Sequence, residues 1–305
     1  MRDAATTDAP LVTIGIPTYN RAHSYLRGVI RAALAQTWPN IEVIVGDNAS
    51  TDDTPKVVGS FDDPRLRLLR HPKNLGANGN FNSLLDEARG EWFLLLHDDD
   101  LVDPDFVETC LGARKAGVDY GFIRTGVRAI NGEGRILKER PNEVEGDRPA
   151  DLYRAWFRAR TGLFLCNTLY RTEALREIGG WKSLHNLLED NFALTKIMAR
   201  HPFLNVRDIR ASYRYSYDQR AYQVPVNDWC EDFLALLELI DGVVDAQDRP
   251  EIHASGSRFF GQLCVRRANA IASPLRRLRA RLAVATHFGV RTLRQPWSLP
   301  SHGPG

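Results

Sequence analysis

The 305-residue sequence has little net charge and no long apolar run. Its 40 basic and 38 acidic side chains leave a formal net charge of +2. A dedicated nucleic-acid-binding protein is expected to be strongly basic, so we expect no nucleic-acid partner. No segment approaches the ~18–20 consecutive apolar residues that a membrane-spanning helix requires. What is left is the composition of an ordinary globular protein, with 43% hydrophobic and 26% charged residues.

Cysteine is scarce as well. The four cysteines are far apart and form no C-x-x-C pair: Cys110, Cys166, Cys230 and Cys264. Each has apolar neighbours, so we expect buried free thiols in a reducing compartment rather than a disulfide or metal framework. The first ten residues, MRDAATTDAP, lack the apolar core of a secretory signal peptide. These features predict a cytoplasmic protein.

Two nucleotide-binding patterns are missing. After the first apolar stretch the chain reads GIPTYNR, without the glycines of the G-x-G-x-x-G dinucleotide fingerprint. The phosphate-binding G-x-x-x-x-G-K-[ST] pattern does not occur in the sequence. The sequence therefore argues against a nicotinamide-dependent enzyme and against a P-loop ATPase.

The most informative stretch that is present is EWFLLLHDDDLVDPD, residues 91–105. Its apolar run, Trp92–Leu96, predicts a strand buried on both faces. His97 and the three carboxylates Asp98–Asp100 follow directly. Adjacent carboxylates at the end of a buried strand repel one another unless a positive charge lies among them, and a hard divalent cation is the simplest such charge. Asp103 and Pro104 then predict the start of a helix.

Asp-rich turns are also common as helix caps and solvated loops, so this segment alone leaves both interpretations open. Three earlier segments predict further strands: Leu11–Ile16, Ile41–Val45 and Arg65–Leu69. Helical patterns lie between these strands and the one at 92–96. Strands that alternate with helices predict a doubly wound, largely parallel sheet. The segments that follow its first, second and fourth strands should meet at one edge: Thr18–Arg21, Asp47–Thr51 and Asp98–Asp100.

In the second half, Gly162–Tyr170 predicts a strand and Thr172–Ile178 a helix that ends at a Gly-Gly-Trp sequence. Residues 185–190 then open another helix with Glu189 and Asp190. Carboxylates at a helix N-terminus are favoured by the helix dipole and need no further function. From about Asn227 onward, apolar residues recur at helical spacing.

Five motifs occur in one order: IPTYNR at 16–21, VGDNASTDDT at 45–54, NLGANGNFN at 74–82, LHDDDLVDPDF at 96–106, and Gly-Gly-Trp followed by LLED at 187–190. In order and spacing they resemble the family 2 glycosyltransferases. The resemblance is strong over residues 10–110, extends to about residue 215 and is lost beyond. It implies the GT-A fold, which is an α/β fold with a Rossmann-like, doubly wound and mostly parallel sheet.

The resemblance implies nucleotide contacts from four segments: Pro17, Thr18, Tyr19, Arg21, Asp47, Lys73, Asn74 and Asp98. A tyrosine can pack on the base and ribose, whereas an arginine or backbone amides can meet the diphosphate. By resemblance, Asp47 accepts a hydrogen bond from the base and Asp98 lies near the ribose. Each has a plainer alternative, such as a surface aromatic for Tyr19 or a helix cap for Asp47.

The resemblance also implies a divalent cation, Mg²⁺ or Mn²⁺, bound by Asp99, with Asp100 supporting it. It assigns Asp190 as the general base that deprotonates the acceptor, and Glu189 as a residue that orients it or contacts sugar. Direct attack assisted by one base inverts the anomeric carbon, whereas retention requires a second, nucleophilic carboxylate. We therefore expect an inverting enzyme.

The sequence departs from the family pattern at two positions. His97 stands where relatives often have aspartate, and Ser216 stands where many have a histidine that reaches the metal or phosphate. Arg214 or Arg220 could clamp phosphate instead. If these departures weaken metal binding, the chain would be a non-catalytic protein that binds sugar nucleotides. A sugar nucleotidyltransferase of related fold is a further alternative, but GIPTYNR lacks the Gly-rich, basic triphosphate loop that such an enzyme needs.

We thus predict a catalytic GT-A domain over residues 10–222, with a nucleotide-binding half at 10–125 and an acceptor-binding half at 126–222. An α-helical extension at 223–294 and a disordered tail at 295–305 follow. The expected partners are a nucleotide-sugar donor, most simply UDP-linked, and an acceptor that is a saccharide, a lipid-linked saccharide or a small molecule. The basic C-terminal helices could contact a membrane peripherally or form a solvated face.

Overall fold

A computed structural model describes residues 9–215 and 224–294. Four parallel strands form its first half, and they lie side by side in the order β3-β2-β1-β4. Their bounds are Val12–Thr18 for β1, Ile41–Asp47 for β2, Leu66–Arg70 for β3 and Trp92–Leu95 for β4. The four strands predicted in this half are therefore confirmed, each within about two residues.

The second half extends the same sheet with mixed pairing. β8 (Thr168–Arg171) lies antiparallel between β4 and β6 (Phe122–Ile130), so β6 runs in the direction of β4. β9 (Phe203–Arg214) is parallel to β6. Two short strands complete the sheet, β5 (Leu101–Val102) on β9 and β7 (Ile136–Arg140) on β6. The predicted fold class, a mixed α/β protein with a mostly parallel sheet, is confirmed.

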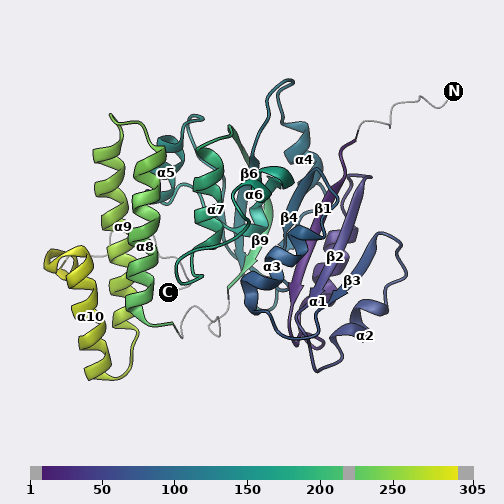
Figure 1. Cartoon of the computed structure of the whole chain (residues 1–305), viewed down its shortest axis with the longest axis horizontal. Coiled ribbons are helices and arrows are strands. Elements are labelled where there is room, and N and C mark those ends of the chain that lie inside the picture. The colour runs from purple at the N-terminus through teal and green to yellow at the C-terminus, as the bar shows by residue number, and fades with distance from the viewer. Residues whose placement is uncertain (1–8, 216–223, 295–305) are drawn as a thin grey trace.

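Helices cover both faces of the sheet (Figure 1). On β2, Val43 and Val45 belong to one apolar cluster and Ile44 to the other, as expected for a strand buried on both faces. One face packs against α1, α2 and α4, and the other against α3 and α5–α7. The helix bounds are Leu26–Leu34 (α1), Thr54–Gly59 (α2), Gly76–Asp86 (α3), Phe106–Gly112 (α4), Pro149–Phe157 (α5), Thr172–Glu177 (α6) and Glu189–Met198 (α7).

Two local predictions are wrong. The helix expected from Asp103 begins at Phe106. Asp103, just after β5, donates its amide to the Arg210 carbonyl of β9, and its carboxylate accepts two hydrogen bonds from the Arg128 guanidinium. Of the strand expected over Gly162–Tyr170, only the end is β8, which starts at Thr168. The preceding residues form a 3-10 turn, η1 (Leu165–Asn167), which is closed by a hydrogen bond from the Phe164 amide to the Asn167 side chain.

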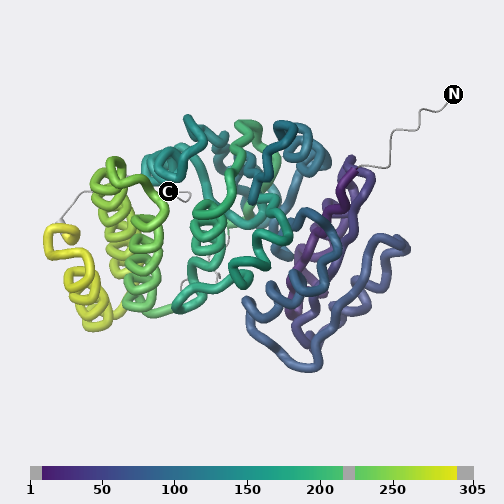
Figure 2. The backbone as a smooth tube through the Cα atoms, turned by 45° about the horizontal axis from the view of Figure 1, so that its top comes forward, coloured from purple at the N-terminus to yellow at the C-terminus, as the bar shows by residue number. Residues whose placement is uncertain are grey.

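Three long helices follow, as the apolar spacing predicts: α8 (Val226–Val243), α9 (Arg249–Asn269) and α10 (Pro274–Phe288), with the 3-10 turn η3 (Val290–Arg294) after them. They lie at one end of the molecule, with β2 and β3 toward the other (Figures 1 and 2). One apolar cluster runs continuously from the sheet through α7 to α8 and α9. The division of the chain into a catalytic domain and an extension stays a prediction.

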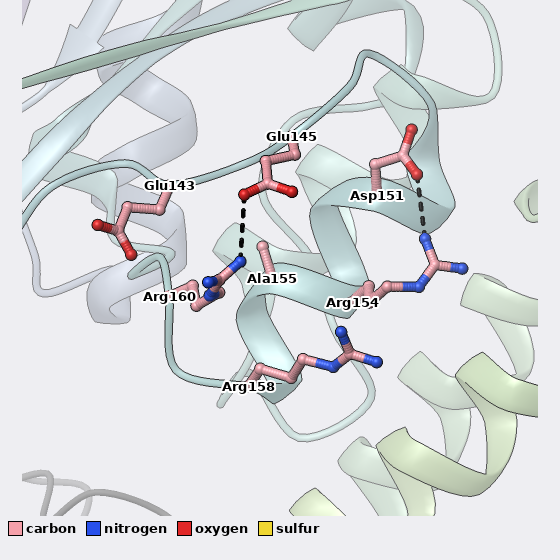
Figure 3. Close-up of a pocket in the computed structure, with 7 residues that line it drawn as sticks. All are labelled: Glu143, Glu145, Asp151, Arg154, Ala155, Arg158 and Arg160. Carbon is pink, nitrogen blue, oxygen red and sulfur yellow. Dashed lines mark hydrogen bonds and ion pairs between the residues drawn. The ribbon is translucent and has the colours of Figure 1, made fainter.

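Ion pairs join α5 to α9 at the surface. Arg154 contacts Glu251 at 2.8 Å and Asp248 at 3.0 Å. Beside this network is a cavity of about 170 Å³, whose lining includes the Arg154–Asp151 and Arg160–Glu145 pairs (Figure 3). The cavity contains none of the predicted site residues. Over the part of the chain that the structure describes, no helix combines the length and apolar character needed to cross a bilayer.

Candidate active site

The turns after β1, β2 and β4 meet at the carboxyl edge of the sheet. The Thr18 hydroxyl donates a hydrogen bond to Asp98 Oδ2 at 2.8 Å, and the Asn48 amide donates to the Thr18 carbonyl at 3.0 Å. Arg21 Nε lies 3.6 Å from the same Asp98 oxygen. Burial raises the pKa of Asp98 to about 6, against the opposing effects of Arg21 and the Thr18 hydroxyl. The structure thus brings together the segments that the topology predicts to converge.

The turn after β1 is held rigidly. Asn20 has a left-handed backbone, with φ of 54°, and its amide donates to the Ser50 hydroxyl at 2.8 Å. Its side-chain oxygen accepts from the Thr51 amide at 2.8 Å. Tyr19 is 45% exposed beside this residue. Pro17 is buried inside β1, whereas Tyr19 and Arg21 are exposed and offer an aromatic ring and a guanidinium to a ligand.

Asp47 ends β2 with a fully buried side chain. Its Oδ1 accepts a hydrogen bond from the Ser50 amide at 2.9 Å. Its Oδ2 has no hydrogen-bond partner among the described residues, although Arg70 Nε lies 3.4 Å away. A buried carboxylate oxygen with unused acceptor capacity suits a ligand N–H donor.

Asn48 fixes the loop before α3 against this edge. Its side chain accepts from the Leu75 amide at 2.8 Å and donates to Asn74 Oδ1 at 3.0 Å. Gly76 then adopts a φ of 76°, a left-handed backbone that glycine adopts without strain. Asn74 is therefore part of the loop's own hydrogen bonding, whereas Lys73 is exposed beside it.

The acidic turn after β4 contains a cluster of possible metal ligands. One ligand atom each from His97, Asp99 and Asp100 lies within 4.8 Å of the others. His97 packs on the Phe81 ring at 5.4 Å between centroids, and its Nε2 is buried without a hydrogen-bond partner in the described chain. Burial lowers the pKa of His97, against the effect of Asp99, which favours the neutral imidazole that can ligate a metal.

Arg214 of β9 fixes this turn through hydrogen bonds. Its amide donates to Asp100 Oδ1 and its Nε to the Asp99 carbonyl, both at 2.8 Å. Its Nη1 donates to the Asn131 carbonyl at 2.6 Å, and the guanidinium lies 3.9 Å from the Tyr25 ring centroid. Burial and the neighbouring Asp99 raise the pKa of Asp100 well above its usual range. Ser216 and Arg220 lie outside the described residues.

The topology places Asp190 at the same edge. Gly121, just before β6, lies against Ile197 near the end of α7, so the C-terminus of α7 is at the opposite edge of the sheet. A 10-residue helix is ~15 Å long. Its N-terminal residues, Glu189 and Asp190, therefore lie toward the carboxyl edge of the sheet. The loop before α7 also touches α3, through a 2.8 Å hydrogen bond from Asn78 to Asn186.

The two described hydrogen bonds to the Asp190 carboxylate both end on Oδ1, from the amide and side chain of Asn191 at 2.7 Å each. Burial raises the pKa of Asp190 to about 6. Such a group is ionised at neutral pH but takes up a proton more readily than an exposed aspartate does.

The Gly-Gly-Trp sequence anchors the loop that leads to α7. Gly180 has a φ of 74°, and a Cβ there would come within 2.2 Å of Asn82 Oδ1. Asn82 accepts from the Trp181 amide at 2.9 Å and donates to its carbonyl at 3.1 Å. The buried Trp181 ring packs against Phe93 at 5.5 Å between centroids. Only glycine allows this close approach to α3.

Sequence reasoning missed Asp232, which lies on α8 with a fully buried side chain. It accepts hydrogen bonds from the Ser183 hydroxyl at 2.8 Å, the His185 amide at 2.7 Å and the Leu187 amide at 3.1 Å. Asp232 therefore fixes the segment just before Glu189 and Asp190. An acidic residue within an apolar helical pattern is the one sequence signal that could have identified it.

The sequence profile of glycosyl transferase family 2 matches residues 13–179, more than half of the chain. The chain belongs to this family. Succinoglycan biosynthesis protein ExoO from Rhizobium meliloti (strain 1021) is 40% identical over 141 residues, which are 46% of this chain and 40% of that protein. The chain thus spans less than half the length of this relative.

Two solved structures share the GT-A fold of this glycosyl transferase family 2 member. TarS 1–349 from S. aureus in complex with UDP-GlcNAc aligns with a TM-score of 0.63 at 17% identity, covering 93% of this chain and 89% of that chain. The mannosyltransferase PcManGT from Pyrobaculum calidifontis, in complex with GDP-Man and Mn²⁺, aligns with a TM-score of 0.57 at 20% identity. That alignment covers 94% of this chain and 83% of PcManGT.

Proposed function

We propose that the chain is an inverting glycosyltransferase, which moves a sugar from a nucleoside diphosphate donor to an acceptor hydroxyl or amine. The observation that supports the proposal is that carboxylates from two distant parts of the chain lie toward one sheet edge. The Asp98–Asp100 turn follows β4, and Asp190 opens α7 at that same edge. Family membership supplies the reaction class.

The nucleotide would bind across the turns after β1 and β2. The unused Oδ2 of Asp47 is proposed to accept a hydrogen bond from a base N–H, which a uracil can donate. Tyr19 would pack on the base or ribose, and Asp98 would accept from the ribose hydroxyls. Arg21 and Lys73, both exposed at this edge, would meet the diphosphate. The two solved structures hold different donors, UDP-GlcNAc and GDP-Man, so the choice of UDP rests on the Asp47 argument.

A divalent cation fits the cluster of His97, Asp99 and Asp100. Carboxylate oxygens suit Mg²⁺ and Mn²⁺, and an imidazole ligand favours Mn²⁺ of the two. The imidazole nitrogen that faces the carboxylates is Nδ1 of His97, which lies 3.9 Å from Asp100 Oδ2 and would complete a mixed nitrogen and oxygen ligand set. When bound, such an ion neutralises charge on a departing diphosphate as a Lewis acid. Arg214 would keep the ligand turn in position through its bonds to Asp99 and Asp100.

Asp190 is proposed as the general base, with Glu189 beside it orienting the acceptor. As the acceptor oxygen or nitrogen forms its bond to the anomeric carbon, its proton passes to the Asp190 carboxylate. The bond from the anomeric carbon to the phosphate oxygen breaks at the same time, and the nucleoside diphosphate leaves with that electron pair. Attack from the side opposite the leaving group inverts the anomeric configuration.

The test is release of UDP from a panel of UDP-sugars with added Mn²⁺, first by slow hydrolysis and then with candidate acceptors. We expect wild-type release to be abolished in Asp99→Asn and retained in Asp62→Ala, whose side chain is exposed on the surface. Tight UDP-sugar binding without release under any divalent metal would instead identify a non-catalytic binding protein. Thermal stabilisation by each nucleotide sugar ranks the donors, because a bound ligand stabilises the fold in proportion to its affinity.

A further inference from the structure

Helix α10 presents its leucines to solvent. Leu275, Leu278 and Leu282 are 60%, 55% and 57% exposed. Spacings of three and four residues place them in one row along the helix. In an ordinary surface helix such a row faces the core. Within α10, which is described throughout, only Val284 is buried, and it lies about two and a half turns from Leu275, on the opposite side.

Arginines flank this leucine row. Arg276, Arg277 and Arg279 are exposed, and Arg281 is half-buried. The sequence contains no acidic residue after Glu251, so the positive charge in this part of the chain is not offset locally. An apolar row with basic residues beside it is the pattern of a helix that lies in the plane of a membrane interface.

The position of α10 leaves this face accessible. The helix forms the outer end of the molecule in both views (Figures 1 and 2). Its inner side contacts α8 and α9, and Arg277 Nε donates to the Ile271 carbonyl at 2.9 Å, which fixes the start of the helix. Val290, just beyond α10, is 70% exposed and adds an apolar group at this end.

We infer that α10 docks on the surface of an anionic lipid bilayer. The leucine row enters the boundary between headgroups and acyl chains, and the arginines pair with lipid phosphates. Charge complementarity favours an anionic bilayer over a second copy of the chain as the partner of this face. Two copies that met symmetrically through this face would bring their arginines together, and like charges across an interface are unfavourable. An anionic surface instead attracts each arginine.

The test is cosedimentation of the full chain with vesicles of phosphatidylcholine, with and without phosphatidylglycerol. We expect binding that requires phosphatidylglycerol and weakens with added salt. Combined Leu275→Ser, Leu278→Ser and Leu282→Ser should lower the partition coefficient roughly a hundredfold or more. Combined Arg276→Gln and Arg279→Gln should lower it roughly twentyfold.

Matched control variants are Ile136→Ser, for an apolar residue that is 56% exposed on β7, and Arg207→Gln, for an arginine side chain that is 77% exposed on β9. Both should bind vesicles as wild type does. Equal binding to both vesicle types, or full binding by the triple leucine variant, would overturn the inference. The inference would also be overturned if wild type failed to bind vesicles and instead formed a concentration-dependent dimer in sedimentation velocity that the leucine substitutions abolish. Circular dichroism of every variant separates lost binding from lost fold.

Discussion

Replacing Asp190 by asparagine should lower turnover at least about 100-fold and at the same time stabilise the folded chain at neutral pH. The carboxylate is held at a pKa of about 6, against 3.8 in the unfolded state, because burial disfavours its charge. Each pKa unit corresponds to about 1.4 kcal/mol, so ionisation of Asp190 costs the fold at most about 3 kcal/mol. Because the side chain is partly open to water, we expect about 2 kcal/mol.

The sign follows from proton binding. Between pH 4 and pH 6 the folded chain keeps the Asp190 proton while the unfolded chain has released it, so stability falls as the pH rises. Above pH 6 the full cost applies. Asparagine cannot ionise, and its carbonyl oxygen can still accept the Asn191 hydrogen bonds. The stability difference between Asp190→Asn and wild type should therefore grow by about 2 kcal/mol from pH 4 to pH 7.

Two measurements check this prediction. Urea unfolding at several pH values gives the stability difference, and sugar transfer gives the turnover. Wild-type kcat should rise with pH and level off above about pH 6, and Asp190→Asn should lower kcat at least about 100-fold at every pH. Asp62→Asn, an exposed carboxylate, serves as the control for removing one charge. A stability difference that does not change with pH, or near-normal turnover of Asp190→Asn, would refute the reasoning.

Two further predictions concern residues that support the site. Asp232→Asn removes the acceptor for the Ser183 hydroxyl and the Leu187 amide; we expect a loss of about 2 kcal/mol in stability and a lower kcat with unchanged UDP affinity by calorimetry. A parallel fall in UDP affinity would argue against this positioning role. His97→Ala should weaken Mn²⁺ binding about tenfold, reducing metal-induced stabilisation by about 1.4 kcal/mol in thermal unfolding. Unchanged stabilisation would exclude His97 as a ligand.

The sequence predicted the first half of the fold well because its signals are local. The parallel strands are short segments rich in apolar residues, of which Trp92–Leu95 is the most continuous, and polar turns follow them. The convergence of Thr18, Asp47 and Asp98 then follows from topology alone. These are the parts of the site that a linear pattern can specify.

Long-range pairing decides the parts that the sequence did not predict. β5 has only two residues, and pairing with Ala211 and Ser212 defines it as a strand. The Asp103 amide also donates to the Arg210 carbonyl of β9, so pairing with β9 extends to the residue after β5, and α4 begins only at Phe106. The irregular segment before Thr168 looks strand-like in sequence, yet Asn167 folds it by donating hydrogen bonds to the carbonyls of Thr125 and Gly162. Neither the β5–β9 pairing nor the hydrogen bonds of Asn167 produce a periodic pattern of apolar residues in the sequence.

The same limit applies to the site. His97 looks like a departure from the family pattern, and only its distance to Asp99 and Asp100 makes it a possible ligand. Arg214 matches a family position, but its bonds to the carbonyls of Asp99 and Asn131 could not be inferred from sequence. The motif suggests that Arg214 clamps phosphate. In the structure its guanidinium instead donates to the acidic turn.

The anchoring of the loop before α7 by a residue of α8 has a consequence for protein engineering. Because Asp232 hydrogen-bonds to Ser183 and Leu187, the C-terminal helices help to set the conformation of the loop beside the proposed acceptor site. A chimera that exchanges these helices for those of a relative would therefore alter the loop beside Asp190 as well. We therefore expect such a chimera to change acceptor preference, because the helices and the loop do not act as independent modules.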